Sequence, residues 1–234
     1  SVISMSLGER GNPYDYYCDN EPLAIYIEQA HQEGIPVFVA AGNDGSIEGI
    51  SFPSCISKAF SVSSTKIDDE ISSSSNRYYT TDFLAPGDSI DSLDLGGGII
   101  QNSGTSMAAP HVTGAALLLL EYYTNMKNIS LRPWQIKHIF RAYGKDISDP
   151  ATGLSYPRID VSASTESKGL VPTDHNASPF YTYDPNPYNY STNPCLKSLK
   201  KDQECVVEWL VNVSGNIPAR YTFFAFFESY SNHY

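Results

Sequence analysis

Apolar and polar residues fall in blocks along the first 45 positions, and these blocks predict a strand, a helix and a second strand. Residues 2–7 read VISMSL, an apolar run that predicts a buried strand ending at Gly8. After a polar stretch, Pro22 suits the first turn of a helix that Gly34 ends. Residues 35–41 read IPVFVAA and predict another buried strand. The residues of the helix that are expected to face the core are Leu23, Ile25, Tyr26, Ala30 and His31.

This order of elements predicts the kind of sheet. A strand, a helix and a strand within about 40 residues form a βαβ unit, so the sheet should be parallel with helices on its faces. Short apolar runs at 59–63 and 82–84 would extend it, and the serine-rich residues 72–75 between them are expected to form a surface loop. The fold class is therefore predicted to be α/β.

Two more helices are expected further along. From Ser106 to about Tyr123 the pattern is helical and apolar on nearly every side, which predicts a buried helix. The next helix is expected from Pro133 to Tyr143, with Gly144 as its stop. Beyond about residue 163 the composition becomes rich in Pro, Tyr and Asn. Residues 164–190 are expected to be a linker, and residues 191–234, with strand-like runs at 204–213 and 221–227, part of a β-rich module.

Composition and charge narrow the range of partners. The chain has 234 residues, of which 41% are hydrophobic, so it can bury one sizeable core. Its formal net charge of -11 argues against nucleic acid or an anionic membrane as a partner, because phosphate binding needs clustered Lys and Arg. No apolar run approaches the roughly 18 to 20 residues that span a bilayer, so no membrane span is predicted.

The four cysteines show no CxxC or Cys/His spacing that suits zinc, and disulfides are the better interpretation. Four N-x-Ser sequons are compatible with a secretory route, although such sequons also occur by chance. They lie at Asn128, Asn176, Asn189 and Asn212.

The segment with the strongest chemical signal is 104–114, which reads GTSMAAPHVTG and puts Ser106 at the start of a helix. A hydroxyl there lies beside unpaired backbone N–H groups and the positive end of the helix dipole, where an alkoxide or an oxyanion is stabilised. On placement alone, a plain N-cap serine is the more common interpretation. Residues 39–45 read VAAGNDG and put Asn43 just after a strand, where an isolated Asn-Asp-Gly would predict a β-turn.

Taken together and in this order, the two segments resemble the nucleophile and oxyanion segments of the subtilase family of serine proteases. The continuation MAAPH after Ser106 separates the chain from the related sedolisins. Further matches follow in family order at residues 4–8, 52–55, 61–63, 85–87 and 157–161. The resemblance covers residues 1–163 as the C-terminal half of a subtilase catalytic domain, and it implies a three-layer α/β/α fold with a mostly parallel sheet.

The resemblance implies a serine endopeptidase that hydrolyses polypeptides through an acyl-enzyme. Ser106 would be the nucleophile, and the Asn43 side chain would donate to the oxyanion together with the Ser106 N–H. The substrate-binding residues that it implies are Ser6, Leu7, Gly8, Ala41, Gly42, Asp44 and Thr105.

The resemblance carries further expectations. It implies a Cys18–Cys55 bridge, which leaves Cys195 and Cys205 as the second pair. No metal site or cofactor is predicted from the residues, because no Asp and Glu run has ligand spacing, and calcium is an expectation from the family only. An extracellular or secretory location is expected.

The contexts of the catalytic aspartate and histidine of the family do not occur in this sequence. Because both precede the serine in family order, they are expected upstream of Ser1, and the N-terminal half of its own catalytic domain is an expected partner. The start inside a strand run indicates a cut, and the chain alone should be nearly inactive. His111 is expected to be structural within the buried helix, since side chains at (i, i+5) point about 140° apart. The alternative is a degenerate, non-catalytic subtilase that acts as a binding or structural module.

Overall fold

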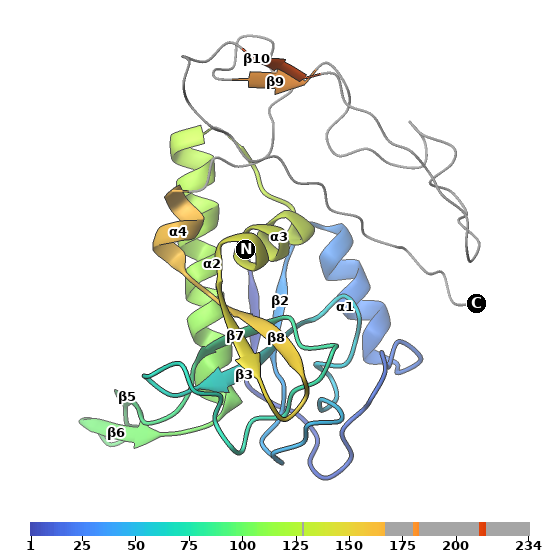
Figure 1. Ribbon diagram of the computed structural model, residues 1–234, viewed down its shortest axis with the longest axis vertical. Helices are drawn as coiled ribbons and strands as arrows, with labels where there is room; N and C mark the ends of the chain where they lie inside the picture. The colour runs from blue at the N-terminus through green and yellow to red at the C-terminus, as the bar shows by residue number, and fades with distance from the viewer. Residues whose placement is uncertain (128, 167–179, 183–210, 214–234) are drawn as a thin grey trace. The chain divides into compact units, whose positions relative to one another are not determined.

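The computed structural model describes residues 1–127, 129–166, 180–182 and 211–213. The chain divides into two units, Ser1–Ser167 and Lys168–Tyr234. The first unit is built on a six-stranded sheet in the order β1-β2-β3-β4-β8-β7 (Figure 1). Its strands are β1 Ile3–Met5, β2 Val37–Ala40, β3 Phe60–Thr65, β4 Phe83–Pro86, β7 Lys145–Asp149 and β8 Leu154–Arg158. All neighbours pair in parallel except β7 and β8, so the predicted mostly parallel sheet is confirmed.

Helices cover both faces of this sheet. The helices are α1 Leu23–Gln32, α2 Thr105–Lys127, α3 Pro133–Tyr143 and α4 Val161–Glu166. Successive side chains of a strand point to opposite faces, and β2 divides its residues accordingly. Phe38 and Ala40 share a core cluster with residues of α2 and α3, whereas Val37 and Val39 share one with residues of α1. The expected α/β/α layering is therefore confirmed.

Helix α2 lies against the central strands because one of its faces is made of small residues. Ala108, Ala109, Val112 and Ala116 are fully buried against Val62 of β3 and its neighbours. Short side chains let the helix backbone approach the sheet closely, and about 25 cal/mol is gained per Å² of apolar surface removed from water. This packing fixes the position of the N-terminus of α2.

For two elements, α1 and the strand at 2–7, the prediction of which residues face the core is partly wrong. On α1, the buried stripe is Ala24, Ile27 and His31, at the i, i+3 and i+7 positions of one helix face. Ile25 and Tyr26 lie outside that stripe and are 71% and 67% exposed, so their predicted burial is wrong. The strand at 2–7 is shorter than predicted and lies at the sheet edge with one described neighbour, β2, which leaves Ile3 exposed rather than buried.

Two other expectations of burial are also corrected. Helix α2 is not buried all round, because Leu117 and Leu118 point away from the sheet and are 48% and 55% exposed. The serine-rich segment at 72–75 is a loop, but Ser72 and Ser75 are buried in it. The Ser75 hydroxyl accepts a hydrogen bond from the Ser64 N–H of β3 at 2.9 Å, which draws the loop onto the sheet.

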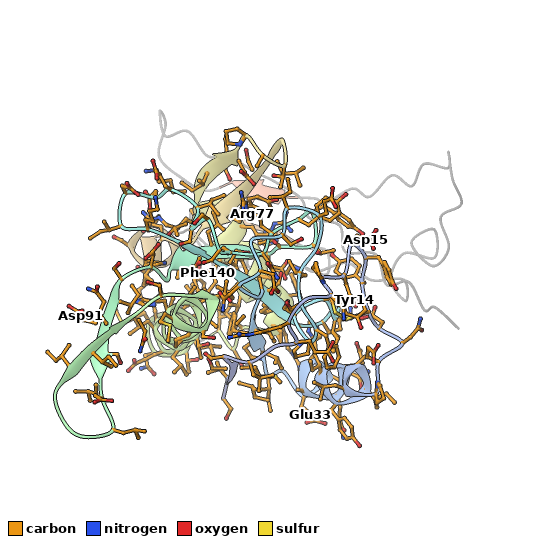
Figure 2. All side chains as sticks on the ribbon, turned by 90° about the horizontal axis from the view of Figure 1, so that it is seen from below. Tyr14, Asp15, Glu33, Arg77, Asp91 and Phe140 are labelled. Carbon is orange, nitrogen blue, oxygen red and sulfur yellow. A yellow bond between two sulfur atoms is a disulfide. The ribbon has the colours of Figure 1, made fainter. Side chains whose placement is uncertain are left out.

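Several described elements had no counterpart in the sequence analysis. Strands β5 Ile90–Leu93 and β6 Ile99–Asn102 form an antiparallel hairpin that projects from the body, with Asp91 on it, whereas Phe140 lies inside (Figure 2). The β7–β8 hairpin and α4 were likewise not predicted. The buried pair of Arg77 Nε and Asp149 Oδ2, 2.6 Å apart, joins β7 to the loop before β4. By contrast, α3 has the predicted bounds.

The second unit contributes β9 Phe180–Thr182, which pairs antiparallel with β10 Val211–Val213. The divisions at residues 164–190 and 191–234 stay predictions. Cys195, Cys205 and the strand run at 221–227 lie outside the described residues. In the first unit, the predicted Cys18–Cys55 disulfide is confirmed. In the described segments, no helix has the length and apolar character needed to cross a membrane.

Candidate active site

Ser106, the predicted nucleophile, is the second residue of α2, at the start of the helix as the sequence predicted. Within the described part of the chain, the Ser106 backbone N–H has no hydrogen-bond acceptor, as expected for the first turn of a helix. The Ser106 hydroxyl donates to the Ser6 carbonyl oxygen at 3.4 Å. Its side chain is half-buried, so a reagent in the adjoining hollow can reach it.

A proline inside α2 shapes the hydrogen bonding of this serine. Pro110 has no N–H, so it cannot donate to the carbonyl four residues earlier, which belongs to Ser106. The Ser6 hydroxyl donates to that carbonyl oxygen instead, at 2.8 Å. Ser6 directly follows β1, so the end of the sheet edge strand and the start of α2 are joined at Ser106.

The side chain of Asn43 is held with its oxygen toward α2. Its Oδ1 accepts from the Thr105 N–H at 2.8 Å and from the Thr105 hydroxyl at 3.0 Å. Thr105 Oγ1 in turn accepts from the Gly42 N–H at 3.2 Å. Within the described residues, Asn43 Nδ2 makes no hydrogen bond, so both of its N–H groups are available. A Cβ at Gly104 would lie 3.2 Å from that nitrogen, which explains a glycine there.

A hollow of about 200 Å³ joins these groups. Its lining residues are Ser6, Leu7, Gly8, Glu9, Arg10, Ala40, Gly42, Asn43, Asp44, Thr105 and Ser106. Of the predicted site residues, only Ala41 is missing from the lining. Its side chain is fully buried in the core that α1 covers, because it lies on the opposite face of the chain from Ala40.

Sequence reasoning missed four residues of this region, Glu9, Arg10, Ala40 and Asn76, and Ala40 is the last residue of β2. Glu9 and Arg10 line the hollow, although they lie in a stretch that was expected only to form a polar turn. Asn76 lies behind it and hydrogen-bonds to the loop that follows Asn43. No local pattern marks Asn76, because its partners lie about 30 positions away in sequence.

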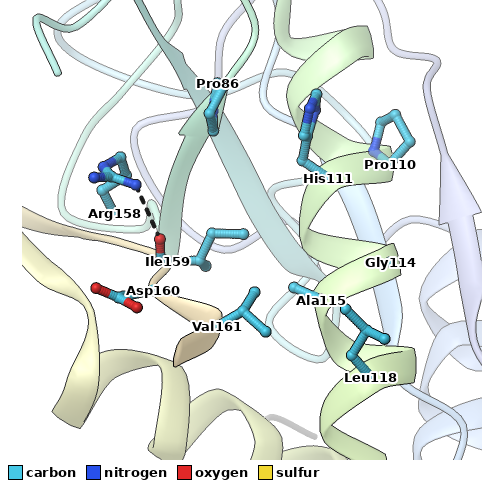
Figure 3. Close-up of a pocket in the computed structure, with 10 residues that line it drawn as sticks. All are labelled: Pro86, Pro110, His111, Gly114, Ala115, Leu118, Arg158, Ile159, Asp160 and Val161. Carbon is cyan, nitrogen blue, oxygen red and sulfur yellow. Dashed lines mark hydrogen bonds between the residues drawn. The ribbon is translucent and has the colours of Figure 1, made fainter. Parts of the chain in front are cut away.

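His111 is exposed, which corrects the expectation that it is buried within α2. It borders a second, shallow hollow of about 540 Å³ between α2 and residues 158–161, where Arg158 donates to the Ile159 carbonyl (Figure 3). Its Nδ1 lies 2.8 Å from the Met107 carbonyl oxygen. All described hydrogen bonds of Ser106 go to Ser6, so His111 is not its base.

The other two histidines in the described residues belong to the core. His31 of α1 and His138 of α3 are 9% and 7% exposed. Burial, helped by the nearby charge of Arg141, lowers the pKa of His138 to about 3, so this side chain is neutral at physiological pH. Neither hydrogen-bonds to Ser106.

The described residues do not favour a metal site. Among them, no three His, Cys, Asp or Glu side chains gather where they could hold one ion. The calcium that the family resemblance suggested stays an expectation, and no step of the chemistry is derived through it.

The mostly parallel three-layer fold, with a serine at the start of its central helix and an asparagine beside it, is that of the C-terminal part of a subtilisin-like domain. The model of the subtilase family matches residues 1–157. The chain belongs to the subtilase family.

Individual relatives agree with this assignment. Subtilisin-like protease 1 of Trichophyton verrucosum is 45% identical over 120 residues, which are 51% of this chain and 28% of that protein. Extracellular serine proteinase of a Thermus species is 38% identical over 125 residues, 53% of this chain and 28% of that protein. The crystal structure of a cold-adapted subtilisin-like serine proteinase, 32% identical, superposes with a TM-score of 0.56 over 67% of this chain and 54% of that one. The chain spans less than a third of the length of these curated relatives.

Proposed function

We propose that this chain supplies the nucleophile and the oxyanion hole of a serine endopeptidase. The observation that carries the proposal is the pairing of Ser106 at the start of α2 with an Asn43 carboxamide whose oxygen is held by Thr105. With the oxygen held, the nitrogen is the end of the amide left for a substrate. The Ser106 N–H and Asn43 Nδ2 would then both donate to the oxyanion.

The reaction follows from these positions. Ser106 Oγ attacks the scissile carbonyl carbon and gives its proton to a histidine base, while negative charge collects on the former carbonyl oxygen. As that tetrahedral intermediate collapses, the C–N bond breaks and the leaving amine takes the proton. Water then hydrolyses the acyl-enzyme by the same steps. The extended peptide would lie along residues 6–8 and pair with their backbone groups.

The base and its aspartate would come from a segment upstream of Ser1, the N-terminal half of the same catalytic domain. Two features of the described residues support such a partner. Strand β1 has a neighbour on one side only, so its other edge can take another strand. The outer face of α2 exposes Leu117 and Leu118, which a further layer would cover. The extracellular location of some relatives supports secretion of the whole protein.

The experiment that tests this function is labelling with an irreversible serine-hydrolase probe. The probe is applied to this chain, to the product of the longer reading frame, and to the longer product carrying Ser106→Ala. We expect labelling of the longer product alone and its loss in the variant. A folded longer product that stays unlabelled after removal of any propeptide would contradict the enzyme and favour the binding-module alternative.

A second experiment tests the upstream partner. The N-terminal segment and this chain are expressed as separate polypeptides and mixed. We expect the mixture to regain probe labelling, and we expect Leu118→Glu on the outer face of α2 to abolish it. Glu121→Gln, on the same helix and exposed, is the matched control and should leave labelling unchanged. Labelling of the Leu118→Glu mixture at the wild-type level would argue against this docking face.

A further inference from the structure

We propose that Asn76 is a positioning residue that fixes the turn bearing Asn43 and so aims the amide that binds the oxyanion. This inference rests on the proposed function. Asn76 lies in the loop between β3 and β4 and is fully buried, with 0% of its surface exposed. It does not line the hollow beside Ser106, so any effect it has on the reaction passes through another residue.

All hydrogen-bonding groups of the Asn76 side chain bind the loop that carries Asn43. Its Oδ1 accepts from the N–H groups of Asp44 at 2.9 Å and Ser46 at 3.0 Å. Its Nδ2 donates to Asp44 Oδ2 at 3.3 Å and to Ser51 Oγ at 3.1 Å. A carboxamide has two acceptor sites and two N–H donors, and all four are used here. No other side chain within the described residues binds this loop at so many points.

The backbone of Asn76 binds the same turn. Its N–H donates to the Gly42 carbonyl oxygen at 3.0 Å, so Asn76 binds the residue before Asn43 as well as the residue after it. Its own carbonyl oxygen accepts from the Ser63 hydroxyl of β3 at 2.6 Å. The turn is thereby fastened to the central sheet.

The close approach of the two loops explains a glycine in the turn. Gly42 has a φ of +104°, a backbone conformation that residues with a side chain rarely adopt. A Cβ there would collide with Ser51 Oγ and with Asn76 Nδ2. The lack of a side chain at Gly42 therefore leaves the room that the side chain of Asn76 occupies.

Asn43 is consequently held at two points. Thr105 holds the oxygen of its side chain, and Asn76 holds the backbone on both sides of it. Shortening Asn76 to alanine would leave the amides of Asp44 and Ser46 without their acceptor and let the turn shift. Because a misplacement of about 1 Å in a catalytic group can cost about 100-fold in rate, we expect Asn76→Ala to lower kcat by about 10- to 100-fold with KM little changed.

The test compares kinetics of the longer, active product carrying Asn76→Ala with three references. Ile136→Val removes one buried methyl group from α3 and controls for lost stability, and it should keep kcat. Asn76→Asp keeps the acceptor for Asp44 and Ser46 but sets a second carboxylate against Asp44 Oδ2, where Nδ2 donates at 3.3 Å, so it should recover little of the lost activity. In an Asn43→Ala background, Asn76→Ala should lower kcat by less than about threefold, because the amide that it aims is already gone.

Hydrogen exchange tests the same proposal without activity. We expect Asn76→Ala to speed exchange of the Asp44 and Ser46 amides while peptides from β4 keep their protection. Unchanged exchange at these two amides, or full multiplication of the two kinetic losses in the double variant, would overturn the proposal. A wild-type protein that neither cleaves peptides nor labels at Ser106 would instead refute the proposed function, and the exchange result would still decide whether Asn76 holds the turn.

Discussion

The Ser6 hydroxyl donates to the Ser106 carbonyl oxygen at 2.8 Å, and it does so because Pro110 supplies no helical N–H to that oxygen. Ser6 therefore stabilises the first turn of α2 at Ser106. We expect Ser6→Ala to lower the free energy of unfolding by about 1 kcal/mol and kcat by about fivefold. The measurement is chemical denaturation and peptide hydrolysis of the longer product. Ser4→Ala, on the exposed strand β1, is the control and should change neither quantity.

Thr105 connects α2 to the turn that carries Asn43 through one hydroxyl group. Its Oγ1 donates to Asn43 Oδ1 and accepts from the Gly42 N–H. Thr105→Val keeps the shape and removes both bonds, so we expect kcat to fall by about 10-fold or more while KM changes little. Thr105→Ser keeps the hydroxyl and should recover most of the rate. Equal kcat values for the valine and serine variants would contradict this role.

His138 makes stability depend on pH. Burial, with Arg141 nearby, lowers its pKa from 6.5 to about 3 in the folded protein. Between these pH values His138 binds a proton more readily in the unfolded chain than in the folded protein. The contribution of neutral His138 to stability is therefore fully present above about pH 6.5 and is lost as the pH is lowered toward 3. We expect His138→Gln to flatten the unfolding free energy in this range, measured by urea denaturation at several pH values. His111→Gln changes an exposed histidine and should follow the wild type.

The Cys18–Cys55 disulfide closes a loop of 37 residues around one side of the site. The Cys18 N–H donates to the Cys55 carbonyl and the Glu9 N–H to the Phe52 carbonyl, so the segment that follows β1 is joined to residues 52–55 by hydrogen bonds as well as by the bridge. On the chain-entropy model, replacing both cysteines by serine should cost about 4 kcal/mol. The measurement is the unfolding midpoint of the double variant and of the wild type with and without reductant. A reductant effect that persists in the double variant would point to another bridge.

The site residues whose positions could be predicted from the sequence lie in short contiguous segments. Ser106 and Asn43 each lie at the end of a strongly apolar element, so their places followed from the boundary between that element and a turn. Asn76 could not be found in this way, because the residues that it binds are distant in sequence and meet it only after the sheet has formed. The β7–β8 hairpin was missed for a different reason, since polar residues such as Lys145 and Asp146 dominate β7 and leave no apolar pattern to mark it.

The faces of the helices were harder to predict than their bounds. The bounds of α3 follow from Pro133 and Gly144, which act locally. Ile25 and Tyr26 are apolar but exposed, because the phase of α1 is set by its contacts with β2 rather than by its own composition. Leu117 and Leu118 show the same limit on α2, where hydrophobicity on all sides did not reveal which side the sheet covers.

The side chain of Ser106 lies in the first turn of α2, whereas the residues that anchor this helix in the core, such as Ala109 and Val112, follow it in the sequence. Replacing the hydroxymethyl side chain of Ser106 by the methyl group of alanine therefore leaves the packing of the helix intact. Under the proposed function, a Ser106→Ala protein would still hold a peptide beside Asn43 without cutting it. Such a variant would then serve as a trap with which natural substrates could be captured and identified.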